Sequence, residues 1–239
     1  MIKARLFGAL GLLASVFLIG CGADEDADKG ARSTASAEAS YPSTYQALSS
    51  KLTLIQNATV LTGDGARIEG GSVLLGDGKV LEIGDDIEVP DDALVIDAQG
   101  KWVTPGIIDN HSHLGVYASP GVSSHADGNE ISGPNTAEVW AEHAVWPQDQ
   151  GFNTARAGGV TALQILPGSA NLFGGRGVTL KNVPSRTMQG MKFPGAPYGL
   201  KMACGENPKR VYGDKGGPFS RMGNVAGYRA AWIKAAAYK

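Results

Sequence analysis

The sequence predicts an α/β protein that begins with a small β-sandwich domain at residues 51–103. Three observations support this prediction. Glycine makes up 34 of the 239 residues, which is roughly twice ordinary usage, and it shows no collagen-like period. Short β-branched runs alternate with turn residues up to Val103. Longer apolar runs of the kind that form buried parallel strands come after that point.

Residues 51–103 consist of short strand-like runs separated by turn residues. The predicted strands are 52–55, 58–61, 72–75, 79–83, 93–97 and 101–103. Gly76, Asp77 and Gly78 separate the third and fourth runs in the way that a hairpin turn does. So many short strands at close spacing are typical of a small sandwich. None of them carries a chemical signature, so we expect a scaffold.

Residues 1–20 have the pattern of a secretory signal peptide, with two basic residues before an apolar run at 6–19. That run is shorter than the roughly 20 residues needed to span a bilayer. Residues 18–21, Leu-Ile-Gly-Cys, resemble the lipobox of bacterial lipoproteins. The resemblance implies cleavage before Cys21, acylation of that cysteine, and a place on the periplasmic face of the outer membrane. The alternative is an ordinary signal peptide with an incidental cysteine.

Residues 21–50 predict a disordered tether. Five acidic and two basic side chains lie in residues 22–50 among many alanines and serines, a composition that buries too little apolar surface to fold. The tether would connect lipidated Cys21 at the cell envelope, with the membrane as partner, to the folded part.

Charge and cysteine content exclude several classes of protein. The net charge is −2 and there is no long basic run, so nothing predicts a nucleic-acid partner. Four histidines and two cysteines exclude a disulfide scaffold and a cysteine-rich zinc module.

His111 and His113 form a His-x-His motif directly after the compact run at 106–109. On a strand, residues i and i+2 face the same side, so both imidazoles can reach one ion. Imidazole suits Zn²⁺ and neighbouring divalent metals. A lone His-x-His is often a surface accident, but its place behind a Pro-Gly-apolar-Asp strand favours a metal site.

The passage from Asp97 to His113, with its Pro-Gly-Ile-Ile-Asp-x-His-x-His run, resembles the first barrel strand of the amidohydrolase superfamily. Residues 51–103 are similar to the companion domain of that family. Further matches are residues 155–161 (Ala-Arg-Ala-Gly-Gly-Val-Thr), 166–171 (Leu-Pro-Gly-Ser-Ala-Asn), 174–177 (Gly-Gly-Arg-Gly) and 201–210 (Lys-Met-Ala-Cys-Gly-Glu-Asn-Pro-Lys-Arg). Together they resemble the imidazolonepropionase-like branch, and they imply that residues 104–239 are part of a TIM (β/α) barrel.

The residues after position 104 fit part of such a barrel. Residues 159–166 and 200–204 are apolar runs expected as buried parallel strands, and 224–239 has the spacing of a helix. A complete barrel takes about 250 residues, whereas 129 run from His111 to the last position. We count three or four strands and expect an incomplete TIM barrel, the N-terminal part of a longer gene product.

The resemblance also implies a divalent metal, Zn²⁺ by preference and one or two ions, that lowers the pKa of bound water to about 7. His111 and His113 match the first pair of ligands. Glu206 is the preferred third ligand and the catalytic residue, because it follows a strand whose end would share the barrel mouth. Lys201, as a carbamylated lysine, is the rival. The later histidines and aspartate of the family have no counterpart here.

Several other residues have two interpretations each. His125 belongs either to a loop or to a lid over the substrate, and His143 is a packed or surface residue rather than a ligand. Gly174 and Gly175 either bring backbone close to a substrate or belong to turns. Asp109 either orients an imidazole or supports the strand beneath it.

Two classes of function follow. The first is a metal-dependent hydrolase of non-peptide C–N bonds in small cyclic amides or amidines, with a dipeptidase as the alternative. The second is a lipid-anchored, non-catalytic remnant or binding module. We expect the 239-residue chain to be inactive alone, and a homo-oligomer is left open for the full-length protein.

Overall fold

A computed structural model describes residues 41–238 of the chain. The predicted signal peptide, Cys21 and most of the predicted tether lie outside the described residues. Within residues 41–238, no helix combines the length and apolar character needed to cross a membrane.

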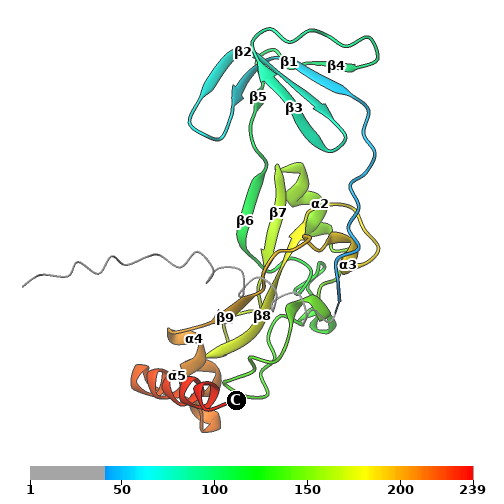
Figure 1. Ribbon diagram of the computed structural model, residues 1–239. Coiled ribbons are helices and arrows are strands. Elements are labelled where there is room, and N and C mark those ends of the chain that lie inside the picture. Colours follow the sequence, from blue (N-terminus) through cyan, green and yellow to red (C-terminus); the bar gives the residue numbers. More distant parts are fainter. Residues whose placement is uncertain (1–40, 239) are drawn as a thin grey trace, which may run out of the picture. The chain divides into compact units, whose positions relative to one another are not determined.

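The first sheet lies between Thr53 and Val103 (Figure 1). Its strands are β1 (Thr53–Leu61), β2 (Arg67–Gly76), β3 (Lys79–Gly84), β4 (Leu94–Asp97) and β5 (Trp102–Val103). The order is β3-β2-β1-β4, and β5 also pairs with β1. The hairpins β1–β2 and β2–β3 are antiparallel, whereas β4 and β5 run parallel to β1. The described strands of this segment form one five-stranded sheet, so the predicted β-sandwich is not confirmed.

The predicted hairpin turn of this sheet is confirmed, but the two predicted strands around Asn57 form one strand. Asp77 and Gly78 both have positive φ, 50° and 71°, as a two-residue type I′ hairpin turn requires. Asn57 also has a positive φ, 63°, but it lies inside β1, where the pairing register shifts between Ile55 and Ala58. A β-bulge therefore joins the two predicted short strands into one.

The second sheet has four strands, β6 (Ile107–Ser112), β7 (Val160–Ile165), β8 (Phe173–Lys181) and β9 (Gly199–Met202), in that order. It curls as part of a barrel (Figure 1). β6 and β7 are parallel, as predicted, but β8 is antiparallel to both β7 and β9. Since TIM-barrel strands are all parallel, β8 is an antiparallel strand inserted into the barrel sequence.

Gly174 and Gly175 belong to β8, so their interpretation as turn residues is wrong. Gly175 has a φ of 106°, and a Cβ atom there would lie 2.5 Å from the carbonyl oxygen of Val139. The N–H of Arg176 donates to that same oxygen at 2.8 Å. The backbone of β8 therefore does make a close approach at these glycines, but it approaches the loop at Val139 and not a substrate.

All described helices come after β6 in the chain, between the strands of the second sheet or after β9. They are α2 (Gln150–Ala157), α3 (Met188–Met191), α4 (Glu206–Tyr212) and α5 (Arg221–Ala236), with 3₁₀ turns η1 (Ser123–His125), η2 (Ala141–His143) and η3 (Gly213–Lys215). The predicted helix at 224–239 is confirmed as α5, which starts earlier because Ser220 caps it through the N–H of Gly223. We call residues 104–238 the barrel half. Its main core consists of Val116, Ala141, Val145, Phe152, Leu163, Ile165, Val178, Leu180, Met188 and Met191.

Candidate metal and substrate site

The two histidines of the His-x-His motif lie side by side at the end of β6. The ring centroids of His111 and His113 are 5.4 Å apart, and the ring planes cross at 84°. The carboxylate of Asp109 accepts a hydrogen bond from the backbone N–H of His111 at 3.1 Å. Asp109 therefore supports the strand beneath the site, which was one of its two predicted roles.

His113 is held in one tautomer by the residue that follows β7. Its Nδ1 lies 2.8 Å from the carbonyl oxygen of Leu166. A carbonyl oxygen only accepts hydrogen bonds, so Nδ1 carries the proton and the Nε2 of the neutral ring keeps its lone pair. This is the arrangement of a metal-ligating imidazole, whose other nitrogen donates to a carbonyl or carboxylate.

Lys201 reaches the pair from β9. Its Nζ lies 3.1 Å from the Nε2 of His111, and partial burial lowers the pKa of Lys201 below the ordinary value of 10.5. A lower pKa increases the fraction of neutral amine, which is the nucleophilic form of a lysine.

Glu206 lies away from this group. It is the first residue of α4, its side chain is 78% exposed, and one carboxylate oxygen lies 3.9 Å from Nε of Arg210. Within residues 41–238, no three His, Cys, Asp or Glu side chains gather closely enough to hold a metal ion. The structure thus brings Lys201 to the histidines and does not bring Glu206, whose role as ligand stays a prediction.

A buried carboxylate that the sequence did not single out fixes the loop after His113. Asp149 caps α2 by accepting from the N–H of Gly151 at 3.0 Å. It also accepts from the N–H of Gly115 at 2.9 Å and of Ser119 at 3.1 Å. One side chain therefore joins the start of α2 to the segment that leaves the His-x-His motif.

A pocket of about 710 Å³ opens beside this segment. Its walls come from the loop after β6 and from residues that follow β7, and they include Val116, Asn129, Trp140, His143, Pro167 and Gly174. The N–H of Val116 donates to the carbonyl oxygen of His113 at 3.2 Å, and Pro167 follows the residue that binds the His113 ring. The pocket therefore shares backbone segments with the imidazoles, but His111, His113 and Lys201 are not among the residues that line it.

The other two histidines lie in the loop after β6 and contact aromatic side chains there. The Nδ1 of His125 lies 3.2 Å from the carbonyl oxygen of Ala118, and its ring meets Trp146 edge-on at 4.7 Å. His143 is half exposed and lies in η2 beside Trp140. Tyr117, which the sequence did not single out, packs edge-on against His113 at 5.9 Å.

Known proteins resemble parts of this chain. No family model matches the chain. The amidohydrolase tasK of Hapsidospora irregularis is 35% identical over 212 residues, which are 77% of this chain and 22% of that protein. The 5-methylthioadenosine/S-adenosylhomocysteine deaminase of Bacillus cereus (strain 03BB102) is 28% identical over 117 residues, which are 46% of this chain and 24% of the deaminase. This chain thus spans about a quarter or less of these curated relatives.

A crystal structure of an amidohydrolase from Thermotoga maritima MSB8 shows the same fold, with 42% identity and a TM-score of 0.72. The match covers 78% of this chain and 48% of that one. These homologues and this structural neighbour place the chain in the amidohydrolase superfamily. The match also confirms the predicted incomplete TIM barrel. By their names, the two curated relatives are an amidohydrolase and a deaminase.

Proposed function

We propose that this chain contributes the first metal ligands and one wall of the substrate pocket to a metal-dependent amidohydrolase of non-peptide C–N bonds. The observation that carries the proposal is the fixed tautomer of His113, beside the ring of His111 and within reach of Lys201. The family relationship of the chain supports a hydrolase of this kind.

The donor set fits a divalent metal such as Zn²⁺. The Nε2 of His113 is free of its own proton, and the Nε2 of His111 faces the amine of Lys201. Nitrogen ligands of this type suit zinc. A bound divalent ion supplies an activated water at neutral pH and polarises a carbonyl group of the substrate.

The chain's own residues position this chemistry. The Leu166 carbonyl holds the His113 ring in orientation, and Asp149 holds the loop that follows. Lys201, whose Nζ lies 3.1 Å from the Nε2 of His111, is the third donor that we favour, as a carbamate. Glu206 is the rival third donor, and its carboxylate does not gather with the two histidines in the described residues.

The pocket of about 710 Å³ is the place where a small substrate would bind. Its size lies in the range of small-molecule sites, and its walls are built at the carboxyl ends of β6 and β7, where TIM-barrel enzymes bind their ligands. Attachment to the cell envelope through lipidated Cys21 completes the proposal for the whole protein.

A non-catalytic role of the 239-residue chain itself is the second candidate. The observation that favours it is that residues 41–238 gather two histidines and one lysine, without a further acidic or histidine ligand. We therefore expect the chain alone to bind metal without turnover.

The experiment that tests the proposal measures zinc bound per chain after loading and desalting. The full 239-residue chain should retain zinc, and the double variant His111→Ala/His113→Ala should lose it. His125→Ala is the matched control, because it removes an imidazole from the neighbouring loop and should leave zinc binding unchanged.

Two single variants separate the rival third ligands. Lys201→Ala should weaken zinc binding and remove any dependence on added bicarbonate, while Glu206→Ala should have no effect. The opposite pattern would assign the third position to Glu206. Equal zinc content in the wild type and the double histidine variant would contradict the proposal.

A further inference from the structure

Residues 41–45, which we call the strap, lie against the barrel half of the molecule. The hydroxyl of Ser43 donates to the carbonyl oxygen of Lys192 at 2.7 Å, and the N–H of Thr44 donates to the carbonyl oxygen of Gln189 at 3.0 Å. The Nζ of Lys181 lies 4.9 Å from the centre of the Tyr45 ring. The strap lies within the last ten residues of the predicted tether, and the composition of the tether did not predict these contacts.

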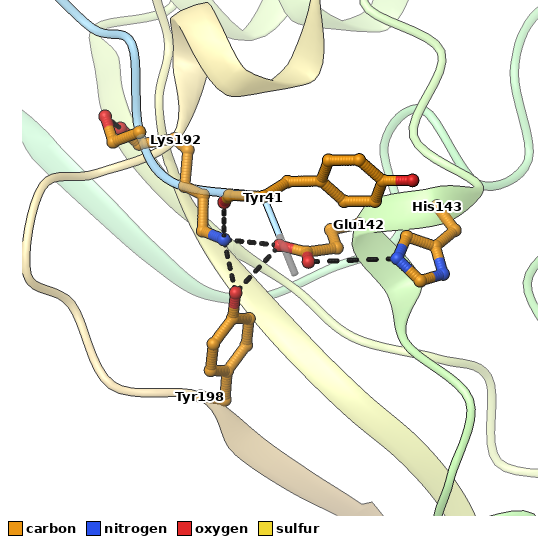
Figure 2. A network of polar contacts seen from close by, with 6 residues as sticks. Tyr41, Glu142, His143, Lys192 and Tyr198 are labelled. Carbon is orange, nitrogen blue, oxygen red and sulfur yellow. Dashed lines mark hydrogen bonds and ion pairs between the residues drawn. The ribbon is translucent and has the colours of Figure 1, made fainter. Parts of the chain in front are cut away.

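The strap completes the hydrogen bonding of a buried ammonium group (Figure 2). Lys192 donates to the backbone carbonyl of Tyr41 at 2.5 Å, to the Glu142 carboxylate at 2.6 Å and to the hydroxyl of Tyr198. An ammonium group has three donors, and here each has one acceptor. Since the side chain of Lys192 is 8% exposed and that of Glu142 is fully buried, leaving one donor unsatisfied would be costly. Docking of the strap supplies the third acceptor.

The same strap residue reaches the wall of the pocket. The ring of Tyr41 meets the His143 ring edge-on at 5.3 Å and 88°. Oε1 of Glu142, which has no hydrogen-bond partner in the described part of the chain, lies 3.9 Å from Nε2 of His143. His143 also stacks on Trp140 at 6.3 Å and 11°, and both rings line the pocket.

We propose that the strap is a positioning element for the pocket. By docking the Tyr41 carbonyl on Lys192, it holds the Glu142 carboxylate in place, and the carboxylate and the Tyr41 ring together fix the orientation of His143 in the pocket wall. A change in the docking of the strap is therefore transmitted to the pocket through Lys192, Glu142 and His143. This role is independent of the proposed metal site.

The experiment measures two properties of the full chain. The first is hydrogen exchange of the strap amides, and the second is the NMR signals of the His143 imidazole, which report its surroundings. The hydroxyl of Ser43 also accepts from the N–H of Tyr45 at 3.1 Å, so Ser43→Ala removes two neutral hydrogen bonds. The exchange rate of the Thr44 amide should therefore rise by at least about threefold. The His143 signals should shift in the same variant.

Three further variants complete the test. Ser43→Thr keeps the hydroxyl and should restore both readouts, whereas Lys192→Met should change both more strongly than Ser43→Ala. Ser49→Ala, in the exposed segment just beyond the strap, is the control and should leave both unchanged. If Lys192→Met does not fold, Ser43→Ala decides alone.

Three results would overturn the proposal. Exchange of the wild-type strap amides at the rate of an unstructured peptide would show that the strap is not docked. An unchanged exchange rate of the Thr44 amide in Ser43→Ala would remove the hydroxyl contact as an anchor. Release of the strap with the His143 signals still at their wild-type positions would separate the strap from the pocket wall.

Discussion

The two sheets of this chain are held by different kinds of contact. The ion pair of the first sheet, Arg67 with Glu69, joins side chains that are 54% and 63% exposed, and its core cluster centres on four small or β-branched residues. The barrel half has a ten-residue core cluster, and its ion pair of Lys192 with Glu142 is buried. Turns and strand pairing therefore shape the first sheet, while buried polar contacts fix the loops around the candidate site.

Breaking the buried ion pair should have the largest effect on stability. Lys192→Met leaves the Glu142 carboxylate buried without its cation, and we expect a loss of about 3–5 kcal/mol in the free energy of unfolding. Arg67→Met breaks the exposed pair of the first sheet and should cost at most about 1 kcal/mol. Urea unfolding of both variants measures the difference.

A double variant sharpens this prediction. Lys192→Met/Glu142→Leu removes both charges and should recover much of the lost stability, because no buried charge is left without a partner. Similar losses for Lys192→Met and Arg67→Met would contradict the contrast between the two sheets.

The hairpin turn of the first sheet should give a smaller effect. Gly78 has a φ of 71°, and an alanine there should cost about 1–2 kcal/mol because of the left-handed conformation. Gly133 is the matched control: a Cβ added there meets no atom within 4 Å and its φ is not positive. Thermal unfolding of Gly78→Ala and Gly133→Ala checks the prediction, which equal melting temperatures would refute.

The stability of the two regions should also fall at opposite extremes of pH, and this effect should be smaller than those of the substitutions above. In the barrel half, burial lowers the pKa of Lys192, but hydrogen bonds to Glu142 and Tyr198 outweigh this and raise it above 10.5. Burial raises the pKa of Tyr198 above 10.0. A raised pKa means that the folded state holds the proton more tightly than the unfolded state does. The contribution of protonated Lys192 and Tyr198 to stability is therefore present below pH 10 and lost as the pH rises through the folded-state pKa values.

The first sheet shows the reverse direction. The hydroxyl of Thr59 lowers the pKa of the Glu69 carboxyl, and the amide of Asn57 lowers that of Asp97. A lowered pKa gives a contribution that is present above the ordinary pKa and lost as the pH falls through the folded-state value. As the pH is lowered, the methyl NMR signals of Val73, in the core of the first sheet, should weaken before those of Leu163, in the core of the barrel half. As the pH is raised, the signals of Leu163 should weaken first. The opposite order would contradict the assignment.

Much of the first sheet could be predicted from sequence, because its signals are local. Asp77 and Gly78 encode a tight turn in two residues, and the apolar runs beside them are short enough to be strands and nothing else. The bulge at Asn57 was missed, since an asparagine between two β-branched runs also suits a loop. The sandwich was expected from strand spacing, which does not determine how many layers the strands form.

The candidate site could be predicted only in part, for the same reason. His111 and His113 are two residues apart on a strand, so their proximity follows from local geometry. Lys201 approaches from β9, ninety residues away, and the resemblance ranked it behind Glu206. The antiparallel strand β8 was missed because its glycines resemble turn residues in the sequence. Only the structure shows that the loop at Val139 packs against Gly175 and leaves no room for a side chain there.

The strap and its ammonium site could not be predicted at all. The contacts join Tyr41 to Lys192 and Glu142, which are far apart in the sequence and carry no motif. Burial of a lysine depends on the whole loop arrangement around it, so its sequence neighbours give no signal.

The proposed metal site has one direct test, which is X-ray absorption at the zinc edge of the zinc-loaded 239-residue chain. We expect two imidazole ligands at the ordinary Zn–N distance of about 2.0–2.1 Å, and loss of their scattering pattern in His111→Ala/His113→Ala. A spectrum that shows no imidazole ligand, or one that the double variant leaves unchanged, would contradict it.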